Sequence, residues 1–228
     1  MPHLCGRAVS EPNRNSAGSD LEAPLVTHYL FVPGGKRTKE DFDQVRALLE
    51  AQGHRTDAIT LSDPEHATLS DHIAELCDLI GRLDAETLHL AGHSYASFVI
   101  TGAADRMAQM IERLIYLDTL IPEDGRSLLD FFTDASVDAA AFGVPTWPPF
   151  VEKLRFDGAI IDALPKTYVH CLRSQFLVMT GAAVDRVQSR LKQEHWTYAE
   201  LDTDHYCMIN AAADVAGILT GSQIGVRG

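Results

Sequence analysis

One short segment of this chain constrains its fold more than any other. The apolar run at residues 87–91 leads directly into Gly92-His93-Ser94-Tyr95-Ala96, which matches Gly-x-Ser-x-Gly except for its last position. In this pattern the serine occupies a tight turn from a strand to a helix, and small residues on either side let the backbones pass. Alanine is small enough for that role. Because a helix is predicted over 95–108, the context favours Ser94 as a nucleophile rather than only as a helix cap.

The pattern around this segment predicts an α/β fold. Short apolar runs alternate with segments of helical periodicity, which is typical of a mostly parallel sheet with crossover helices. About six strands flanked by helices are expected. The predicted strands are 29–32, 54–61, 87–91, 114–117, 168–171 and 196–201. A helical stripe over 73–83 has Ser70 as its expected N-cap.

The domain organisation follows from length and local composition. A chain of 228 residues with 46% hydrophobic residues can bury one substantial core. Residues 1–23 have no apolar periodicity and are predicted to form a loose arm before a domain over 24–228. The alternation stops at about 120–165, where an inserted cap rich in aromatic residues is expected. The rings are Phe131, Phe132, Phe142, Trp147, Phe150 and Phe156.

Charge limits the partners. The 32 acidic residues outnumber the 19 Lys and Arg, which gives a net charge of −13. This field repels nucleic acid and anionic membrane surfaces, so we expect a neutral, partly apolar small-molecule substrate. No apolar run reaches the roughly 18 residues of a membrane span, and no signal sequence is evident, so a cytoplasmic location is expected. The sequence predicts no metal and no cofactor, and it leaves a homodimer open.

A serine hydroxyl needs a base within hydrogen-bond reach. In enzymes with this elbow, the chain order is serine, acid, histidine. His205 follows the last predicted strand, so it should reach the same sheet edge as Ser94 and act as the base. The other histidines are interpreted structurally. Five are predicted to lie in exposed loops: His28, His54, His66, His72 and His195. His89 and His170 are predicted to lie within strands.

The acid is less directly indicated. Its usual place, after the strand that ends at Cys171, holds no carboxylate. Asp118 ends the preceding strand and emerges at the same edge, where it can accept the Nδ1 proton of His205. Asp202 and Asp204 are the alternatives, although they lie very close to His205 in sequence.

The turn after the first strand supplies a candidate anion site. Gly34-Gly35 permits close backbone approach. The amides of Gly35 and Tyr95 are therefore predicted to bind an oxyanion formed when a carbonyl is attacked. We predict that the substrate is contacted by Gly34, His93, Trp147 and Phe150.

Residues 25–219 resemble a bacterial and plant group of α/β hydrolases that includes hydroxynitrile lyases, plant methyl esterases and bacterial esterase-like proteins. The resemblance rests on the elbow at 92–96, the run at 116–125 and the closing segment at 200–205. It implies the α/β-hydrolase fold and a Ser-His-Asp triad. In the bacterial branch that shares the run at 116–125, the carboxylate after the usual strand is also absent, which favours Asp118.

The chain departs from this group at several positions. The lyases carry a lysine after the catalytic histidine and a threonine in the oxyanion loop, where this chain has Tyr206 and Gly34. Cyanohydrin cleavage is therefore not expected. The loop begins Pro33-Gly34 instead of His-Gly, and its usual aromatics are replaced by Lys-Arg-Thr-Lys at 36–39.

Together these features predict hydrolysis of a carboxylic ester, or a related acyl substrate, through an acyl-enzyme. Two alternatives remain at this stage. One is a C–C bond hydrolase or cofactor-free oxygenase on the same scaffold, in which His205 and Asp118 carry the chemistry. The other is a non-catalytic homologue that binds a small molecule, which the altered oxyanion loop suggests.

Overall fold

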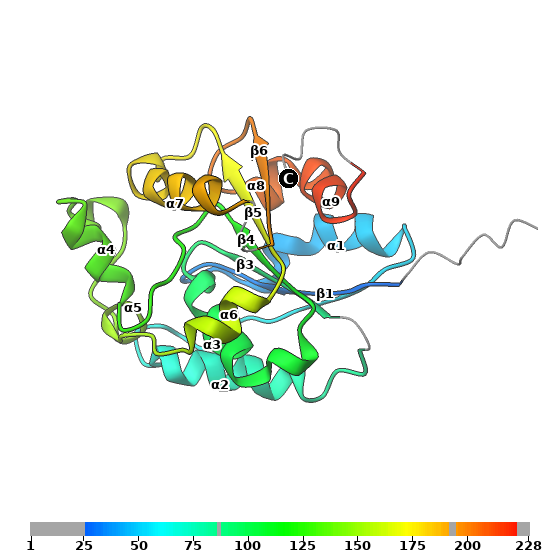
Figure 1. The fold of residues 1–228 in the computed structure, drawn as a ribbon, viewed down its shortest axis with the longest axis horizontal. Helices are drawn as coiled ribbons and strands as arrows, with labels where there is room; N and C mark the ends of the chain where they lie inside the picture. The colour runs from blue at the N-terminus through cyan, green and yellow to red at the C-terminus, as the bar shows by residue number, and fades with distance from the viewer. Residues whose placement is uncertain (1–25, 86–87, 192–194, 223–228) are drawn as a thin grey trace, which may run out of the picture.

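The computed structural model describes residues 26–85, 88–191 and 195–222, and Figure 1 shows their fold. In these residues six strands form one sheet in the order β2-β1-β3-β4-β5-β6, with every pairing parallel. The strands are β1 His28–Val32, β2 Arg55–Ala58, β3 Leu88–His93, β4 Arg113–Leu117, β5 Lys166–Cys171 and β6 Trp196–Leu201. The predicted α/β-hydrolase architecture of about six strands is confirmed. The arm at 1–23 and Thr87 lie outside the described residues.

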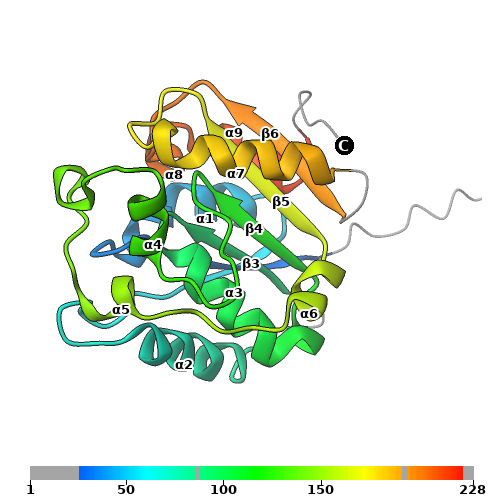
Figure 2. The same ribbon diagram turned by 60° about the vertical axis from the view of Figure 1, so that its left-hand side comes forward.

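Helices cover both faces of the sheet (Figures 1 and 2). One face packs against α1 Asp43–Glu50, α8 Cys207–Asn210 and α9 Ala212–Leu219. The other packs against α2 Leu69–Ile80, α3 Ala96–Met107, α6 Gly158–Ala163 and α7 Leu177–Arg190. Short 3-10 turns occur at Lys39–Phe42, Ala108–Met110 and Ala139–Phe142. Burial on both faces explains why the central strands β1, β3 and β4 consist mostly of apolar residues.

The strand order creates a crevice at one edge of the sheet. The chain leaves β1 toward β2 and later crosses back to form β3 on the other side of β1. Connections that depart in opposite directions leave a gap at the carboxyl ends of the two strands, where ligands bind in open α/β sheets. The turn at Gly34 and the elbow at Ser94 both lie at this point, because Val32 pairs with Gly92.

The part of the β4–β5 segment that contains α4 Leu128–Asp134 and α5 Pro148–Val151 lies beyond the carboxyl ends of the strands, and Figure 1 shows both helices at this end of the molecule. The last part of the segment returns to the sheet as α6. An isolated bridge joins Arg126 and Leu154. That this segment acts as a cap over the site stays a prediction. No helix within the described ranges is long and apolar enough to cross a membrane.

The start of α2 corrects one prediction. Ser70 is not the N-cap. The hydroxyl of Thr68 accepts a hydrogen bond from the Asp71 N–H, and the Asp71 carboxylate accepts one from the Thr68 N–H. Thr68 is the N-cap because Asp71, three residues later, supplies the carboxylate that completes a capping box. Ser70 instead forms hydrogen bonds with Glu152.

Two histidines also lie elsewhere than predicted, because both are buried. His28 begins β1, and its Nε2 lies 2.7 Å from Asp57 Oδ2. His72 lies on the core-facing side of α2, with Nδ1 2.9 Å from the Tyr95 hydroxyl and Nε2 3.0 Å from the Ser62 carbonyl. Residue 72 is spaced three after Leu69 and four before Leu76, so helical periodicity already indicated a buried position.

Thr68→Ala removes the acceptor of the capping box. The free energy of unfolding should fall by about 1 kcal/mol, because one N–H at the start of α2 loses its partner. Urea titration measures the change. Thr68→Ser keeps the hydroxyl and should stay close to wild type; equal losses in both variants would assign the effect to side-chain packing.

His89 on β3 links stability to pH. Burial lowers the pKa of His89 to about 4, and the nearby positive charges of Arg113 and His54 act in the same direction. Its ring packs edge-on against Tyr29, while the Glu112 carboxylate lies 3.7 Å from Nε2. The folded protein therefore holds this imidazole neutral, whereas the unfolded chain protonates it near its ordinary pKa.

Because the pKa is lowered on folding, the contribution of His89 is complete above about pH 6.5 and is lost as the pH falls toward about 4. In His89→Leu, the loss of unfolding free energy between about pH 7.5 and pH 4 should be smaller than in wild type by about 3 kcal/mol. Denaturant titration at each pH measures it. His66→Leu, which removes an exposed histidine, is the control, and identical pH profiles for wild type and His89→Leu would contradict the prediction.

Candidate active site

The elbow holds Ser94 in an unusual backbone conformation. Its φ is +54°, in the left-handed region that residues other than glycine rarely adopt. The Ser94 N–H donates to the Leu117 carbonyl at 3.2 Å, and the Thr119 hydroxyl donates to the Ser94 carbonyl at 2.5 Å. The residues two before and two after are close, since a Cβ on Gly92 would lie 3.0 Å from the carbonyl oxygen of Ala96. These contacts hold the strained turn and leave Ser94 partly exposed.

His205 and Asp118 meet directly. His205 Nδ1 lies 2.7 Å from Asp118 Oδ2, and the Cys171 N–H donates to Asp118 Oδ1 at 3.2 Å. The Asp118 side chain is fully buried, and the residue itself has a positive φ of +43°. Since an ionised carboxylate only accepts hydrogen bonds, Nδ1 carries the proton and Nε2 keeps a free lone pair.

The two alternative acids point elsewhere. Asp202 forms an exposed ion pair with Arg173, with 2.9 Å between Oδ1 and Nε. Asp204 accepts hydrogen bonds from the Tyr206 N–H and from the side-chain amide of Asn210. Of the three carboxylates considered from the sequence, only Asp118 therefore contacts the imidazole of His205.

The rings of His93 and Phe176 pack against His205. The Nε2–H of His93 donates to the His205 carbonyl at 2.8 Å, and the centroids of the two imidazoles are 4.4 Å apart. The ring of Phe176 also lies 4.4 Å from that of His205. Burial holds the pKa of His93 well below its usual value, so this ring stays neutral.

Phe176 was not predicted from the sequence as a residue of the site. It lies in the connection between β5 and α7, and its ring had no motif to mark it. The signal was positional, because that connection starts at the same carboxyl edge as Ser94 and His205.

The glycine turn after β1 packs tightly against the elbow. A Cβ on Gly34 would lie 3.1 Å from His93 Nδ1 and 3.2 Å from Ser94 Cβ. A Cβ on Gly35 would lie 2.7 Å from the ring of Phe150, so neither position has room for a side chain without rearrangement. Among the described residues, the N–H groups of Gly35 and Tyr95 donate to no other group. Their predicted role in binding an oxyanion stays a prediction.

Two pockets meet at Ser94 and His205. The inner pocket, of about 40 Å³, extends past Asp118 toward Leu120 and Met179. The outer pocket, of about 160 Å³, extends along the glycine turn, and several aromatic rings line it. Those rings are Tyr95, Phe142, Trp147, Phe150, Phe176 and Tyr206. Among the described residues, no hydrogen bond joins the Ser94 hydroxyl to His205; in ligand-free sites such contacts are often long.

Some of the residues predicted to contact substrate or to form the cap line the outer pocket, and others lie elsewhere. Trp147 and Phe150 line the outer pocket, with ring centroids 5.7 Å apart. Gly34 and His93 also line it, but His93 is almost completely buried and directs Nε2 to the His205 carbonyl. Phe131 packs against Phe98, away from Ser94.

Two cations lie at the outer pocket, and both are already paired. Lys36 Nζ is 2.6 Å from Glu65 and 4.1 Å from the ring centroid of Trp147. Arg37 makes two hydrogen bonds with Asp41, which raise its pKa. The pocket is therefore close to neutral. In the described part of the chain, no group of three or more His, Cys, Asp or Glu side chains could hold a metal ion.

Comparisons with known proteins agree with this architecture. A 115-residue segment is 48% identical to the carbendazim hydrolyzing esterase of a Nocardioides species and covers 46% of each chain. A 125-residue segment is 26% identical to the putative methylesterase 11 of Arabidopsis thaliana, covering 51% of this chain and 32% of that protein. The chain thus matches less than half the length of these relatives.

Polyneuridine aldehyde esterase has a similar structure, with a TM-score of 0.70 at 17% identity over 86% of this chain and 99% of that one. At this identity the likeness shows the fold alone. Residues 29–218 match the model of the alpha/beta hydrolase family. Since this match spans most of the chain and agrees with the sheet order and the elbow, the chain belongs to the alpha/beta hydrolase family.

Proposed function

We propose that this chain hydrolyses carboxylic esters through a Ser94-His205-Asp118 triad. The observation that carries the proposal is the 2.7 Å contact between His205 Nδ1 and buried Asp118, at a pocket that His205 shares with Ser94. The names of the two relatives, an esterase and a methylesterase, support the same class of reaction. Carbendazim is therefore among the first compounds to test.

The chemistry follows the order of these groups. Ser94 Oγ attacks the ester carbonyl while His205 Nε2 takes its proton, and Asp118 stabilises the imidazolium. The oxyanion is held by the amides of Gly35 and Tyr95. The imidazolium then protonates the leaving alcohol, and an acyl group remains on Ser94. Water, deprotonated by the same imidazole, releases the acid and restores the serine.

The proposed substrate is uncharged near the reacting bond and carries a ring or other apolar group. Trp147 and Phe150 offer aromatic surface, while the charges of Lys36 and Arg37 are occupied by Glu65 and Asp41. We also propose that residues 120–165 form the cap that supplies this surface. The cytoplasmic location and the absence of a cofactor stay predictions, and a homodimer stays an open alternative.

A fluorophosphonate probe tests the nucleophile. Wild type should be labelled on Ser94, and Ser94→Ala should abolish labelling and lower kcat on an ester by about 10⁴-fold or more. Mass spectrometry and steady-state kinetics measure the two effects. If Ser94→Ala kept its turnover while His205→Ala lost it, the result would support the alternative of a C–C bond hydrolase or cofactor-free oxygenase. A folded wild type that neither reacts nor turns over esters would indicate a binding protein.

The identity of the acid is tested separately. Asp118→Asn should lower kcat by about 10⁴-fold, because the amide can no longer stabilise the imidazolium or fix its tautomer. Asp202→Asn and Asp204→Asn are matched controls and should keep most of the activity. A larger loss in Asp204→Asn than in Asp118→Asn would overturn this assignment.

A further inference from the structure

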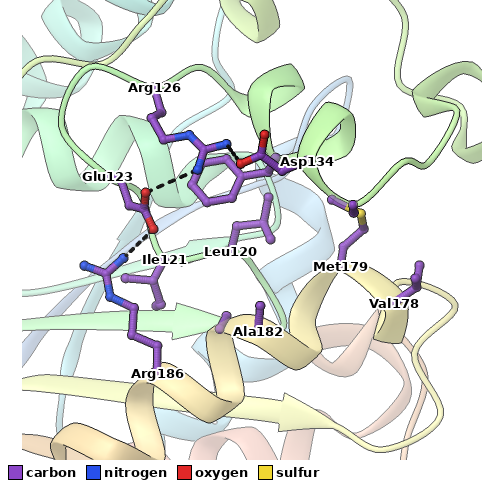
Figure 3. Close-up of a pocket in the computed structure, with 12 residues that line it drawn as sticks. Leu120, Ile121, Glu123, Arg126, Asp134, Val178, Met179, Ala182 and Arg186 are labelled. Carbon is purple, nitrogen blue, oxygen red and sulfur yellow. Dashed lines mark hydrogen bonds and ion pairs between the residues drawn. The ribbon is translucent and has the colours of Figure 1, made fainter.

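A third cavity lies beside the inner pocket. We call it the side cavity; it has a volume of about 280 Å³ and lies between α7 and the segment that runs from Leu120 to α4 (Figure 3). Leu120 and Met179 line the side cavity and also line the inner pocket at Ser94. These two buried side chains therefore separate a very small pocket from a much larger space.

The charged groups of the side cavity neutralise one another. Glu123 accepts from Arg186 at 3.1 Å and from Arg126 at 3.3 Å, and Arg126 reaches Asp134 at 2.5 Å. Figure 3 shows these contacts along one side of the cavity. With two cations and two anions in one chain of contacts, no charge is left over for a charged ligand.

The rest of the lining is apolar. It comes from both walls and includes Leu120, Ile121 and Phe131 on one side and Met179 on α7. Val178 also lines the side cavity but not the inner pocket, and Figure 3 shows its side chain diverging from that of Met179. Such a space suits hydrocarbon, provided that the partition is opened.

The two volumes decide what fits beside Ser94. A water molecule needs about 10–15 Å³ of such space, so the inner pocket, at about 40 Å³, holds a group of only a few non-hydrogen atoms. The outer pocket, at about 160 Å³, takes the larger part of a substrate. The two substituents of the scissile ester must then differ in size.

We propose that Leu120 and Met179 determine substrate size: they close the inner pocket and restrict the enzyme to esters with one short substituent, and their removal opens the side cavity to longer chains. This inference rests on the proposed ester hydrolysis at Ser94. It concerns specificity, so Leu120 and Met179 contact substrate without taking part in proton transfer.

Two series of esters test the inference. In one, p-nitrophenyl esters carry acyl groups from acetyl to octanoyl; in the other, alkyl benzoates carry alcohols from methanol to hexanol. Wild-type kcat/KM should fall steeply with length in the series whose variable group enters the inner pocket. In Leu120→Ala and Met179→Ala, kcat/KM for the six-carbon member, relative to the shortest member, should rise at least about tenfold, since each buried methylene contributes to binding.

Two further variants make the test specific. Val178→Ala enlarges only the side cavity and should keep the wild-type length profile. Adding Ala182→Phe to Leu120→Ala refills the side cavity and should reverse the gain, because Ala182 lines that cavity and not the inner pocket. Leu120→Val repeats the test with a smaller change if the alanine variant does not fold, as judged by circular dichroism.

The outcomes separate the two proposals. A wild type that reacts with fluorophosphonate and hydrolyses short esters supports the proposed function; variants that are also labelled but keep its length profile overturn the size limit alone. An equal gain in Val178→Ala would also overturn it. A wild type that turns over no ester and escapes labelling overturns the proposed function, and the size limit falls with it.

Discussion

The site depends on the register of the parallel sheet around β3. This strand is hydrogen-bonded to β1 on one side and to β4 on the other, with Val32 opposite Gly92 and Leu117 opposite His93. Parallel strands that end at the same level deliver the residues that follow them to one edge. The glycine turn, Ser94 and Asp118 therefore come together, although they are far apart along the chain. A shift of one residue in either pairing would turn every side chain of that strand to the opposite face.

The backbone at this edge is strained where the chemistry is proposed. Among the described residues, five other than glycine have a positive φ, and three of them are Lys36, Ser94 and Asp118. Each such conformation costs on the order of 1–3 kcal/mol and persists only where the surroundings enforce it. Here the enforcement is visible. The Thr119 hydroxyl binds the Ser94 carbonyl, while the Asp118 N–H donates to Val169.

Much of this could be predicted from the sequence because it depends on chain order. Alternating apolar runs indicate a parallel sheet, and the order of the strands assigns Ser94, Asp118 and His205 to one edge without any distance being known. Contact between Asp118 and His205 also requires the ends of β4 and β6 to converge over β5. The sheet order permits this convergence, and the 2.7 Å contact shows it.

Other features depend on packing between distant segments, which leaves no local pattern. The contact of Phe176 with His205 is one example, and the partition made by Leu120 and Met179 is another. The prediction that His72 occupies an exposed loop was wrong for a different reason. Its polar character outweighed a helical spacing that placed it inside, where the Tyr95 hydroxyl and the Ser62 carbonyl satisfy both ring nitrogens.

The position of Asp118 has a consequence for how such a site can change. Its carboxylate is held by a main-chain N–H, that of Cys171, and no side chain beyond β5 is needed to supply it. The connection after β5 is thus released from providing an acid, and it contributes Phe176 to both pockets instead. Substitutions in this connection can reshape the pocket walls while the proposed proton-transfer groups stay in place, so selectivity and reactivity can evolve on separate segments of the chain.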